Sequence, residues 1–216
     1  MKERPLPEIS METDGRDQNV VLVVSAPSGG GKTSICRAFL KAYPDVYFSV
    51  SSTTRAPRPG EVNGRDYRFI TREAFRKKIE QGEFLEWEEN FGHYYGTPRE
   101  EVEGKLRQGR DVLFDVDPRG GRRIRDYFPR GVFIFILPPS LEVLEERLSQ
   151  RGSEDRDALK RRISRALDEI QEALWYDYVI FNEDLKTSID AMKAVYVAEK
   201  IRVGRQEKRL RPFLRR

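Results

Sequence analysis

Apolar and polar residues alternate along this chain in blocks that predict strands and helices in turn. An unbroken apolar run, VVLVV, covers residues 20–24, a helical pattern covers about residues 32–42, and another short, mostly apolar segment covers residues 46–50. Unbroken apolar runs of this length suit parallel strands that are covered on both faces. The start of the chain therefore predicts the opening of a βαβ unit.

The second half of the chain continues this order. Two more apolar runs, at residues 112–116 and 132–137, are each followed by a helical stretch. Ser140 is placed to cap a helix whose leucines share one face, and Gly152 is placed to end it. The remaining pattern predicts a helix over about residues 155–175, a strand over residues 178–181 and a closing helix over about residues 185–203. Together these elements predict an α/β fold whose parallel sheet has helices on both faces.

The middle of the chain has a different pattern. Strand-like aromatic segments at residues 67–70 and 84–91 flank a helix near residues 72–81, and a long polar loop, residues 51–65, precedes them. Residues 97–100, TPRE, have the sequence of a capping box with proline at the first helical position. We therefore predict a small mixed α/β lobe inserted into the core, with a cleft between the two.

The two ends of the chain differ from the rest. Residues 1–19 are polar and lack any period, so we expect a mobile leader there. The predicted segments are the leader (1–19), a folded domain (20–200) that consists of a core (20–50 and 98–200) and a lobe (51–97), and a basic tail (201–216).

Positive charge is concentrated in the tail. Residues 202–216 contain seven Lys or Arg and one Glu, whereas the formal net charge of the whole chain is only +4, so the remaining residues are slightly acidic. A short basic end of this kind favours a solvated, partly disordered tail over an element that binds nucleic acid. We therefore expect no nucleic-acid partner.

Composition limits the cellular compartment that we expect for the protein and the kinds of site that it can contain. The apolar runs are too short to span a bilayer and no export signal is present, so we expect a cytoplasmic protein with no membrane partner. The single cysteine, Cys36, excludes an internal disulfide, and the single histidine, His93, excludes a site built from several histidines. Oligomeric state is left open.

The loop after the first strand reads SAPSGGGKTS at residues 25–34. It nearly matches the phosphate-loop pattern, but Ala26 stands where the first glycine belongs. In such a loop, backbone N–H groups surround phosphate oxygens, Lys32 adds positive charge and the Thr33 hydroxyl can bind Mg²⁺. An ordinary glycine-rich turn is the rival interpretation. The order strand, loop, helix favours a site for a nucleoside triphosphate.

A second anion site is predicted in the polar loop. Arg55 and Arg58 are three residues apart and braced by prolines, which makes a stiff fork for an anionic group. The whole segment, SVSSTTRAPRPGEVNGRDYRF at residues 49–69, resembles the nucleoside-monophosphate segment of guanylate kinases. Further matches to that family follow in order at residues 84–87, 94–97, 115–117, 138–140, 147–152 and 179–182.

This resemblance implies roles for individual residues. The GMP set is Ser51, Arg55, Arg58, Tyr67 and Tyr95 at the phosphate, with Glu86, Thr97 and Asp115 at the base. The ATP set is Ala26, Pro27, Ser28, Gly29, Gly30, Gly31, Lys32, Thr33, Ser34 and Asn182. The catalytic set is Lys32, Arg55, Arg147, Arg151 and Arg162, the last three on a helical lid at about residues 147–165. Thr33 would hold Mg²⁺, with Asp117 acting through water.

The resemblance also implies an activity. The chain would fold as a phosphate-loop nucleoside-triphosphatase-like α/β domain and transfer a phosphoryl group from ATP to GMP, with Mg²⁺, giving ADP and GDP. Two alternatives remain at this point. One is a catalytically silent guanylate-kinase-like module that binds protein partners, and the other is a kinase for another nucleoside monophosphate.

One position departs from the family pattern. After Asp117 the family has an apolar residue followed by Gln and Gly, whereas this chain has Pro118, Arg119 and Gly120. Proline favours extended backbone at Asp117, and Arg119 adds a positive charge near the expected cleft.

Overall fold

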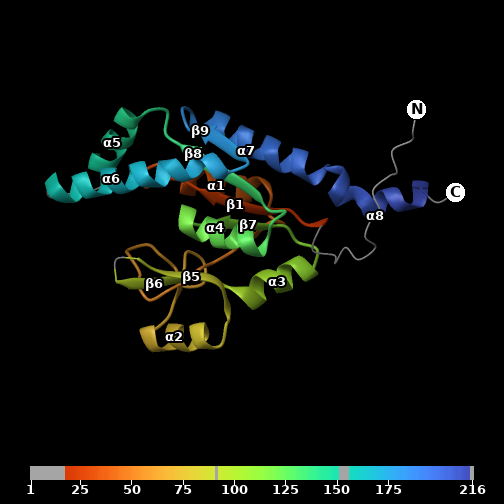
Figure 1. Ribbon diagram of the computed structural model, residues 1–216, viewed down its shortest axis with the longest axis horizontal. Coiled ribbons are helices and arrows are strands. Elements are labelled where there is room, and N and C mark those ends of the chain that lie inside the picture. The colour runs from red at the N-terminus through yellow and green to blue at the C-terminus, as the bar shows by residue number, and fades with distance from the viewer. Residues whose placement is uncertain (1–17, 91, 151–155, 215–216) are drawn as a thin grey trace, which may run out of the picture.

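The buried centre of the molecule is a parallel sheet, as the apolar runs predict. The computed structural model describes residues 18–90, 92–150 and 156–214. The strands of this sheet are β1 (Val21–Ser25), β2 (Tyr47–Phe48), β7 (Val112–Asp115), β8 (Val132–Leu137) and β9 (Tyr178–Phe181). They are all parallel and lie in the order β2, β7, β1, β8, β9 (Figure 1). The predicted α/β fold is therefore confirmed.

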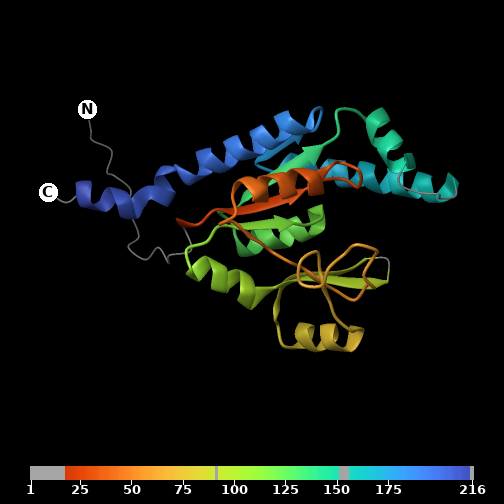
Figure 2. The same ribbon diagram turned by 180° about the vertical axis from the view of Figure 1, so that it is seen from behind.

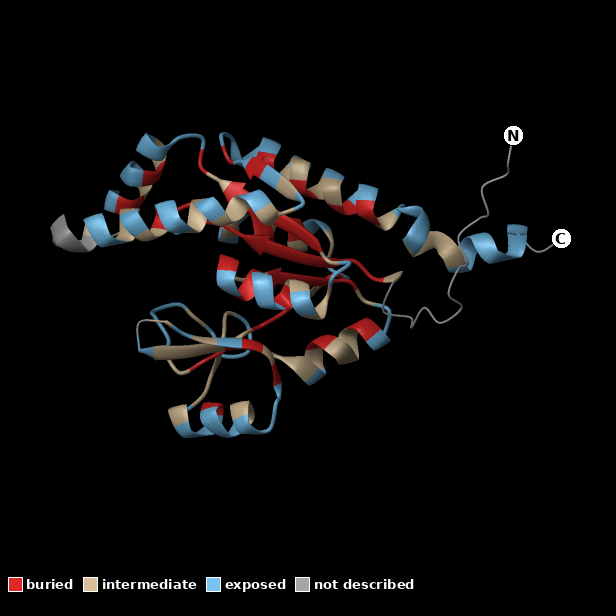
Figure 3. Cartoon of the chain, in the orientation of Figure 1, coloured by how far each residue is buried: buried red, intermediate tan, exposed pale blue. Residues whose placement is uncertain are grey.

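Alternate residues of β1 pack against opposite layers of helices. The covering helices are α1 (Lys32–Ala42), α3 (Arg99–Arg107), α4 (Pro118–Tyr127) and α7 (Leu185–Lys200). Leu22 and Val24 join an apolar cluster with α1 and α7, whereas Val21 and Val23 join one with α3 and α4. Figure 1 shows α4 in front of the sheet, and the reverse view in Figure 2 shows α1 in front. The strands between them are buried, as Figure 3 shows.

Two further helices form an arm at one end of the sheet (Figure 1). They are α5 (Leu141–Gln150) and α6 (Arg156–Gln171), and a short 3-10 turn, η2 (Glu172–Trp175), follows them. The predicted cap is confirmed, because the backbone N–H of Val143 donates to Ser140 Oγ at 3.3 Å. Gly152, predicted to end α5, lies outside the described residues. Leu144 and Leu148 of α5 pack with Ala166 of α6 in a separate cluster.

A second, four-stranded sheet forms the inserted lobe below α4 in Figure 1. Its elements are β3 (Ser52–Thr53), β4 (Arg68–Phe69), α2 (Arg72–Glu80), β5 (Phe84–Asn90) and β6 (His93–Pro98). The strand order is β4, β3, β6, β5, and β5 pairs antiparallel with β6. Phe75 of α2 stacks on Phe84 and Tyr94, with ring centroids 4.4 and 5.3 Å apart. Aromatic packing therefore holds the helix against the sheet.

The predicted capping box at residues 97–100 is wrong. Thr97 ends up inside β6, and the cap of α3 is Pro98, which provides no side-chain hydrogen bond. The Thr97 hydroxyl instead donates to Glu86 Oε1 at 2.6 Å. Thr97 is fully buried, and its hydroxyl satisfies the buried carboxylate of Glu86. It is therefore not available to cap α3.

The basic tail is also more ordered than expected. The closing helix ends at Lys200, and a separate helix, α8 (Val203–Leu214), follows it. Arg205 of α8 donates to the carbonyl oxygen of Arg130 at 3.1 Å, which anchors the start of α8 to the core. None of the helices in the described part of the chain combines the length and apolar composition that a membrane crossing requires.

A buried carboxylate joins the starts of β1 and β7 to α7. Asp111, which directly precedes β7 and is only 6% exposed, accepts from the backbone N–H of Val20 at 2.7 Å and from the Tyr196 hydroxyl at 2.6 Å. Lys200 forms an ion pair with the same carboxylate at 2.7 Å. Three donors, two from α7 and one from the residue before β1, therefore depend on one side chain.

We predict that Asp111→Ala lowers the free energy of unfolding by about 3 kcal/mol, because it leaves two buried donors and a cation without their acceptor. Urea denaturation followed by circular dichroism measures this. The matched control is Asp190→Ala, which removes an exposed ion pair with Lys193 and should change stability by less than about 0.5 kcal/mol. Equal stability of the two variants would contradict a structural role for Asp111.

Candidate active site

The phosphate loop lies between β1 and α1, as predicted. Gly29 and Gly31 have φ angles of 89° and 92°, which only glycine adopts without strain. A Cβ atom at Gly30 would lie 2.9 Å from the Cβ of Ala26, which is itself buried. The alanine at the first pattern position therefore packs beneath the loop, where a larger side chain would have no room.

Asn182 supports this loop from below. Its Nδ2 donates to the carbonyl oxygen of Gly30 at 3.0 Å, and its Oδ1 accepts from the Ser188 hydroxyl at 3.1 Å. A Cβ at Gly31 would lie only 2.2 Å from Asn182 Nδ2. The structure thus brings Asn182 to the loop, where its amide fixes the loop backbone.

Lys32 is tied to the carboxyl end of the neighbouring strand β7. Its Nζ lies 2.7 Å from Asp115 Oδ1 and donates to the carbonyl oxygen of Val116 at 2.6 Å. Burial alone would lower the pKa of Lys32, but the charge of Asp115, the hydrogen bond with Asp115 and smaller charge effects together outweigh burial, and the pKa is raised. Lys32 therefore stays protonated beside the loop. Asp115, which the resemblance assigns to the base, contacts Lys32 in this structure.

Arg147 of α5 reaches the same loop. Its Nη2 donates to the carbonyl oxygen of Asn182 at 3.4 Å. Its Nη1 is buried, has no hydrogen-bond partner among the described residues, and lies 3.9 Å from the Cβ position of Gly31. A buried donor left open at a phosphate loop fits an anionic ligand.

The other two predicted lid arginines are Arg162 and Arg151. Arg162 of α6 donates to the carbonyl oxygen of Leu148 at 3.5 Å, at the junction of α5 and α6. Arg151 lies outside the described residues.

Across the cleft, the lobe holds the predicted arginine fork. Both Arg55 Nη atoms donate to Glu61, at 2.8 and 3.0 Å, and the backbone N–H of Arg58 donates to Glu61 Oε2 at 2.7 Å. The hydrogen bond to Glu61 is the main reason that the pKa of Arg55 is raised. Sequence reasoning missed Glu61, although it lies within the segment that carries the resemblance. The Arg58 side chain is exposed.

Two tyrosines flank this fork. The guanidinium of Arg55 lies 5.3 Å from the ring centroid of Tyr67, and the rings of Tyr67 and Tyr95 are 6.0 Å apart. Burial raises the pKa of Tyr67, and the charge of Asp115 raises it further, which puts this ring within electrostatic reach of the phosphate loop. Ser51 directly precedes β3, and its carbonyl oxygen accepts from Arg68 at 2.9 Å. The structure thus brings Arg55, Tyr67 and Tyr95 of the predicted phosphate set together.

Glu86 is the most buried carboxylate of the cleft, with 7% of its surface exposed. It lies opposite Thr97 in the β5 and β6 pairing and accepts that hydroxyl at 2.6 Å. Burial raises its pKa to about 7, partly offset by the Thr97 hydrogen bond and reinforced by the charge of Asp117. A carboxylate so poorly solvated has a strong demand for hydrogen-bond donors.

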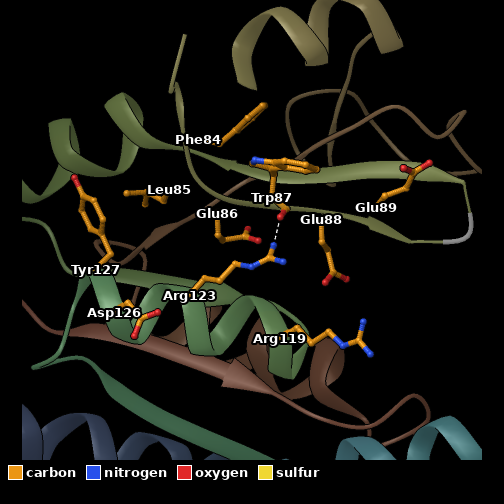
Figure 4. A pocket seen from close by; sticks show the side chains of 10 residues that line it. All are labelled: Phe84, Leu85, Glu86, Trp87, Glu88, Glu89, Arg119, Arg123, Asp126 and Tyr127. Carbon is orange, nitrogen blue, oxygen red and sulfur yellow. Dashed lines mark hydrogen bonds between the residues drawn. The ribbon is translucent and has the colours of Figure 1, made fainter. Parts of the chain in front are cut away.

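Glu86 opens into a pocket of about 670 Å³ between β5 and α4, and its neighbour on that face is Glu88 (Figure 4). Arg123 of α4 crosses the pocket and donates to the carbonyl oxygen of Trp87. Burial and a hydrogen bond with Asp117 raise the pKa of Glu88 to about 8. Glu88 therefore carries the proton of this carboxyl pair, a feature that the sequence alone did not reveal.

Asp117 also organises the start of α4. It caps the helix by accepting the backbone N–H of Gly120 at 2.8 Å, and Pro118 occupies the first helical turn, where a missing N–H costs nothing. A Cβ at Gly120 would meet Asp117 Oδ1 and Glu86 Oε2 at 3.4 Å each, so these two carboxylates are neighbours. Pro118 and Arg119, which depart from the family pattern, therefore fit the start of α4 without disturbing it. Arg119 is exposed at the edge of the pocket.

The donor set at the loop suits a divalent cation that arrives with phosphate. Among the described residues, no group of three or more His, Cys, Asp or Glu could hold a metal ion alone. Mg²⁺ commonly keeps several waters and uses phosphate oxygens with one or two protein oxygens. The exposed hydroxyl-bearing Thr33, which follows Lys32 in the first turn of α1, fits that mode.

Comparisons with known proteins agree on one family. The family model described as guanylate kinase matches residues 18–199. The guanylate kinase of Syntrophus aciditrophicus (strain SB) is 47% identical over 89% of this chain and 93% of its own length. That of Symbiobacterium thermophilum is 47% identical over 88% and 90%. A crystal structure of guanylate kinase from Anaplasma phagocytophilum is similar with a TM-score of 0.73 and 34% identity, over 87% of this chain and 89% of that one.

We predict that the buried Glu86 makes stability fall as pH rises. The folded protein holds the Glu86 proton up to about pH 7, whereas the unfolded chain releases it near its ordinary, lower pKa. Between about pH 5 and about pH 8, the free energy of unfolding should fall by about 2.5 kcal/mol more in the wild type than in Glu86→Gln. Urea denaturation of both proteins at several pH values measures the difference. Parallel pH profiles would contradict a raised pKa.

Proposed function

This chain belongs to the guanylate kinase family, and we propose that it recognises guanine through the buried carboxylate of Glu86. It transfers a phosphoryl group from ATP to GMP, giving ADP and GDP, and uses Mg²⁺. The single observation that carries the proposal is the burial of Glu86 beside the Thr97 hydroxyl, which donates to it at 2.6 Å.

Guanine offers what Glu86 lacks. Its N1–H and N2–H₂ groups are adjacent donors that one carboxylate can accept, while the Thr97 hydroxyl can turn to donate to O6. Adenine has no such paired donors and would leave Glu86 desolvated and unsatisfied, a mismatch that discriminates strongly. The closeness of Asp117 and Glu86 to the same side of Gly120 supports Asp117 as the neighbouring base-site carboxylate. The ion pair of Asp115 with Lys32 supports a role for Asp115 at the phosphate loop.

The acceptor phosphate is proposed to bind the fork of the lobe. Arg55, Arg58, Tyr67 and Tyr95 would donate to the dianion, with Ser51 beside them. Glu61 holds Arg55 by two hydrogen bonds, so the protein itself orients the guanidinium that would bind the phosphate. Pre-orientation of this kind lowers the entropic cost of binding.

The donor side is proposed to be the phosphate loop, residues 26–34, with Asn182 beneath it. Lys32 stays charged, and Arg147 offers a buried N–H beside Gly31. Arg151 and Arg162 are proposed to complete the closure of the lid over the triphosphate. Bound Mg²⁺ supplies charge neutralisation, and Thr33 would hold it, with Asp117 acting through water.

The residues act by positioning and by charge. A phosphate oxygen of GMP, already anionic, attacks the γ-phosphorus of ATP in line, so no His or Cys nucleophile is needed. Lys32 and the lid arginines neutralise the charge that develops, and closure excludes water as a competing acceptor. The intact Lys32 and the buried Arg147 disfavour a catalytically silent binding module.

The segment assignments are part of the same proposal. Residues 51–97 would be the GMP-binding lobe, residues 147–165 the lid, and residues 20–50 and 98–200 the core. A cytoplasmic location without a nucleic-acid or membrane partner remains a prediction from the sequence.

We predict that purified protein releases ADP with GMP as acceptor and far more slowly with AMP, UMP or dTMP. Glu86→Gln should lower kcat/KM for GMP by about 10²-fold, because it loses a charged acceptor of two hydrogen bonds, and should change AMP use much less. A coupled ADP-release assay measures both. Glu80→Gln, on the exposed face of α2, is the matched control. An unchanged preference for GMP over AMP in Glu86→Gln would contradict the assignment.

A further inference from the structure

Helix α6 contacts both substrate-binding parts of the molecule through two neighbouring side chains. Glu169 Oε2 accepts from the backbone N–H of Ser28, in the phosphate loop, at 3.2 Å. Arg165, one turn earlier, donates through Nε to Glu169 Oε1 at 2.9 Å. The same guanidinium donates through Nη1 to Asn90 Oδ1, at the end of β5 in the lobe, at 2.9 Å. These contacts form a continuous bridge from lobe to loop.

The chemistry of the bridge makes it stiff. A guanidinium is planar and presents its donors in a fixed fork, so Arg165 holds Asn90 and Glu169 at a set separation. Glu169 is mostly buried, with 16% of its side chain exposed, and Arg165 is 37% exposed. If closure of the lobe moves Asn90, Arg165 and Glu169 therefore move with it and shift the hydrogen bond to the N–H of Ser28.

Arg165 also has an electrostatic role in this bridge. Glu169 places a carboxylate at an N–H of the loop that is built to bind phosphate, and the two anions would repel each other without a counter-charge. Arg165 supplies that charge. Its field also extends into the cleft, because it contributes to the lowered pKa of Asp117, which burial alone would raise.

We propose that Arg165 and Glu169 are positioning residues that couple the two substrate sites, so that GMP bound in the lobe raises the affinity of the phosphate loop for ATP. This proposal rests on the proposed function. Asn90 carries the link to the lobe only, whereas Arg165 carries both that link and the neutralisation of Glu169. The two residues therefore have separable effects.

Calorimetric titration with the Mg²⁺ complex of the β,γ-imido analogue of ATP, without and with saturating GMP, measures the coupling. In the wild type, GMP should raise analogue affinity by about fivefold or more. Asn90→Ala should bring this factor close to one and leave the affinity without GMP unchanged. Asn90→Asp, which keeps the acceptor, should retain the coupling. Arg165→Gln should lose it and should also bind the analogue more weakly without GMP.

Two variants on the same helix serve as matched controls. Lys160→Gln removes an exposed cation of α6, and Asp168→Asn removes an exposed carboxylate next to Glu169. Both should keep the wild-type coupling factor, and circular dichroism should give the same unfolding midpoint for them as for Asn90→Ala. A general loss of helix stability would instead affect the controls as well.

The results of these experiments distinguish failure of the coupling proposal from failure of the proposed function. The coupling proposal is contradicted if Asn90→Ala or Arg165→Gln keeps the wild-type coupling factor. It is also contradicted if the wild type shows no coupling although it phosphorylates GMP. Absence of GMP turnover in the wild type would overturn the proposed function, and the bridge with it.

Discussion

The cost of burying charge is the constraint on which the cleft depends. Lys32 is buried because Asp115 faces it at 2.7 Å, and Arg55 is held because Glu61 takes both of its Nη atoms. Two charged groups of the described cleft are less completely paired. Arg147 Nη1 has no acceptor among the described residues, and Glu86 has the Thr97 hydroxyl as its short side-chain donor. One group lacks an anion and the other lacks donors, which is what a triphosphate and a guanine base supply.

The parallel sheet could be predicted from sequence because its strands are apolar on both faces. The helix α1 has the predicted bounds, since a strand and a glycine loop fix its start. The short strand β3 and the strand β6 were not predicted, because a two-residue polar strand has no pattern and β6 is interrupted by Gly96. Pairing across the lobe, a non-local interaction, creates both.

The site could be predicted only as a set of residue types. The resemblance identified Glu86 and Thr97 together, but the hydrogen bond between them, which takes Thr97 away from a helix cap, depends on the register of β5 against β6. The contacts of Asp115 with Lys32 and of Asp117 with Gly120 depend on where β7 ends and α4 begins. Contacts that join distant segments, such as Arg165 with Asn90, leave no local signal in the sequence.

The central claim is that a poorly solvated Glu86 waits for the paired donors of guanine, and proton release on GMP binding tests it most directly. Because burial holds the pKa of Glu86 near 7, about half of these carboxyl groups are protonated at that pH, and two N–H donors favour the charged form. Calorimetry of GMP binding at pH 7, in buffers of different ionisation enthalpy, should show release of about half a proton more from the wild type than from Glu86→Gln. Equal release from the two proteins would contradict the account.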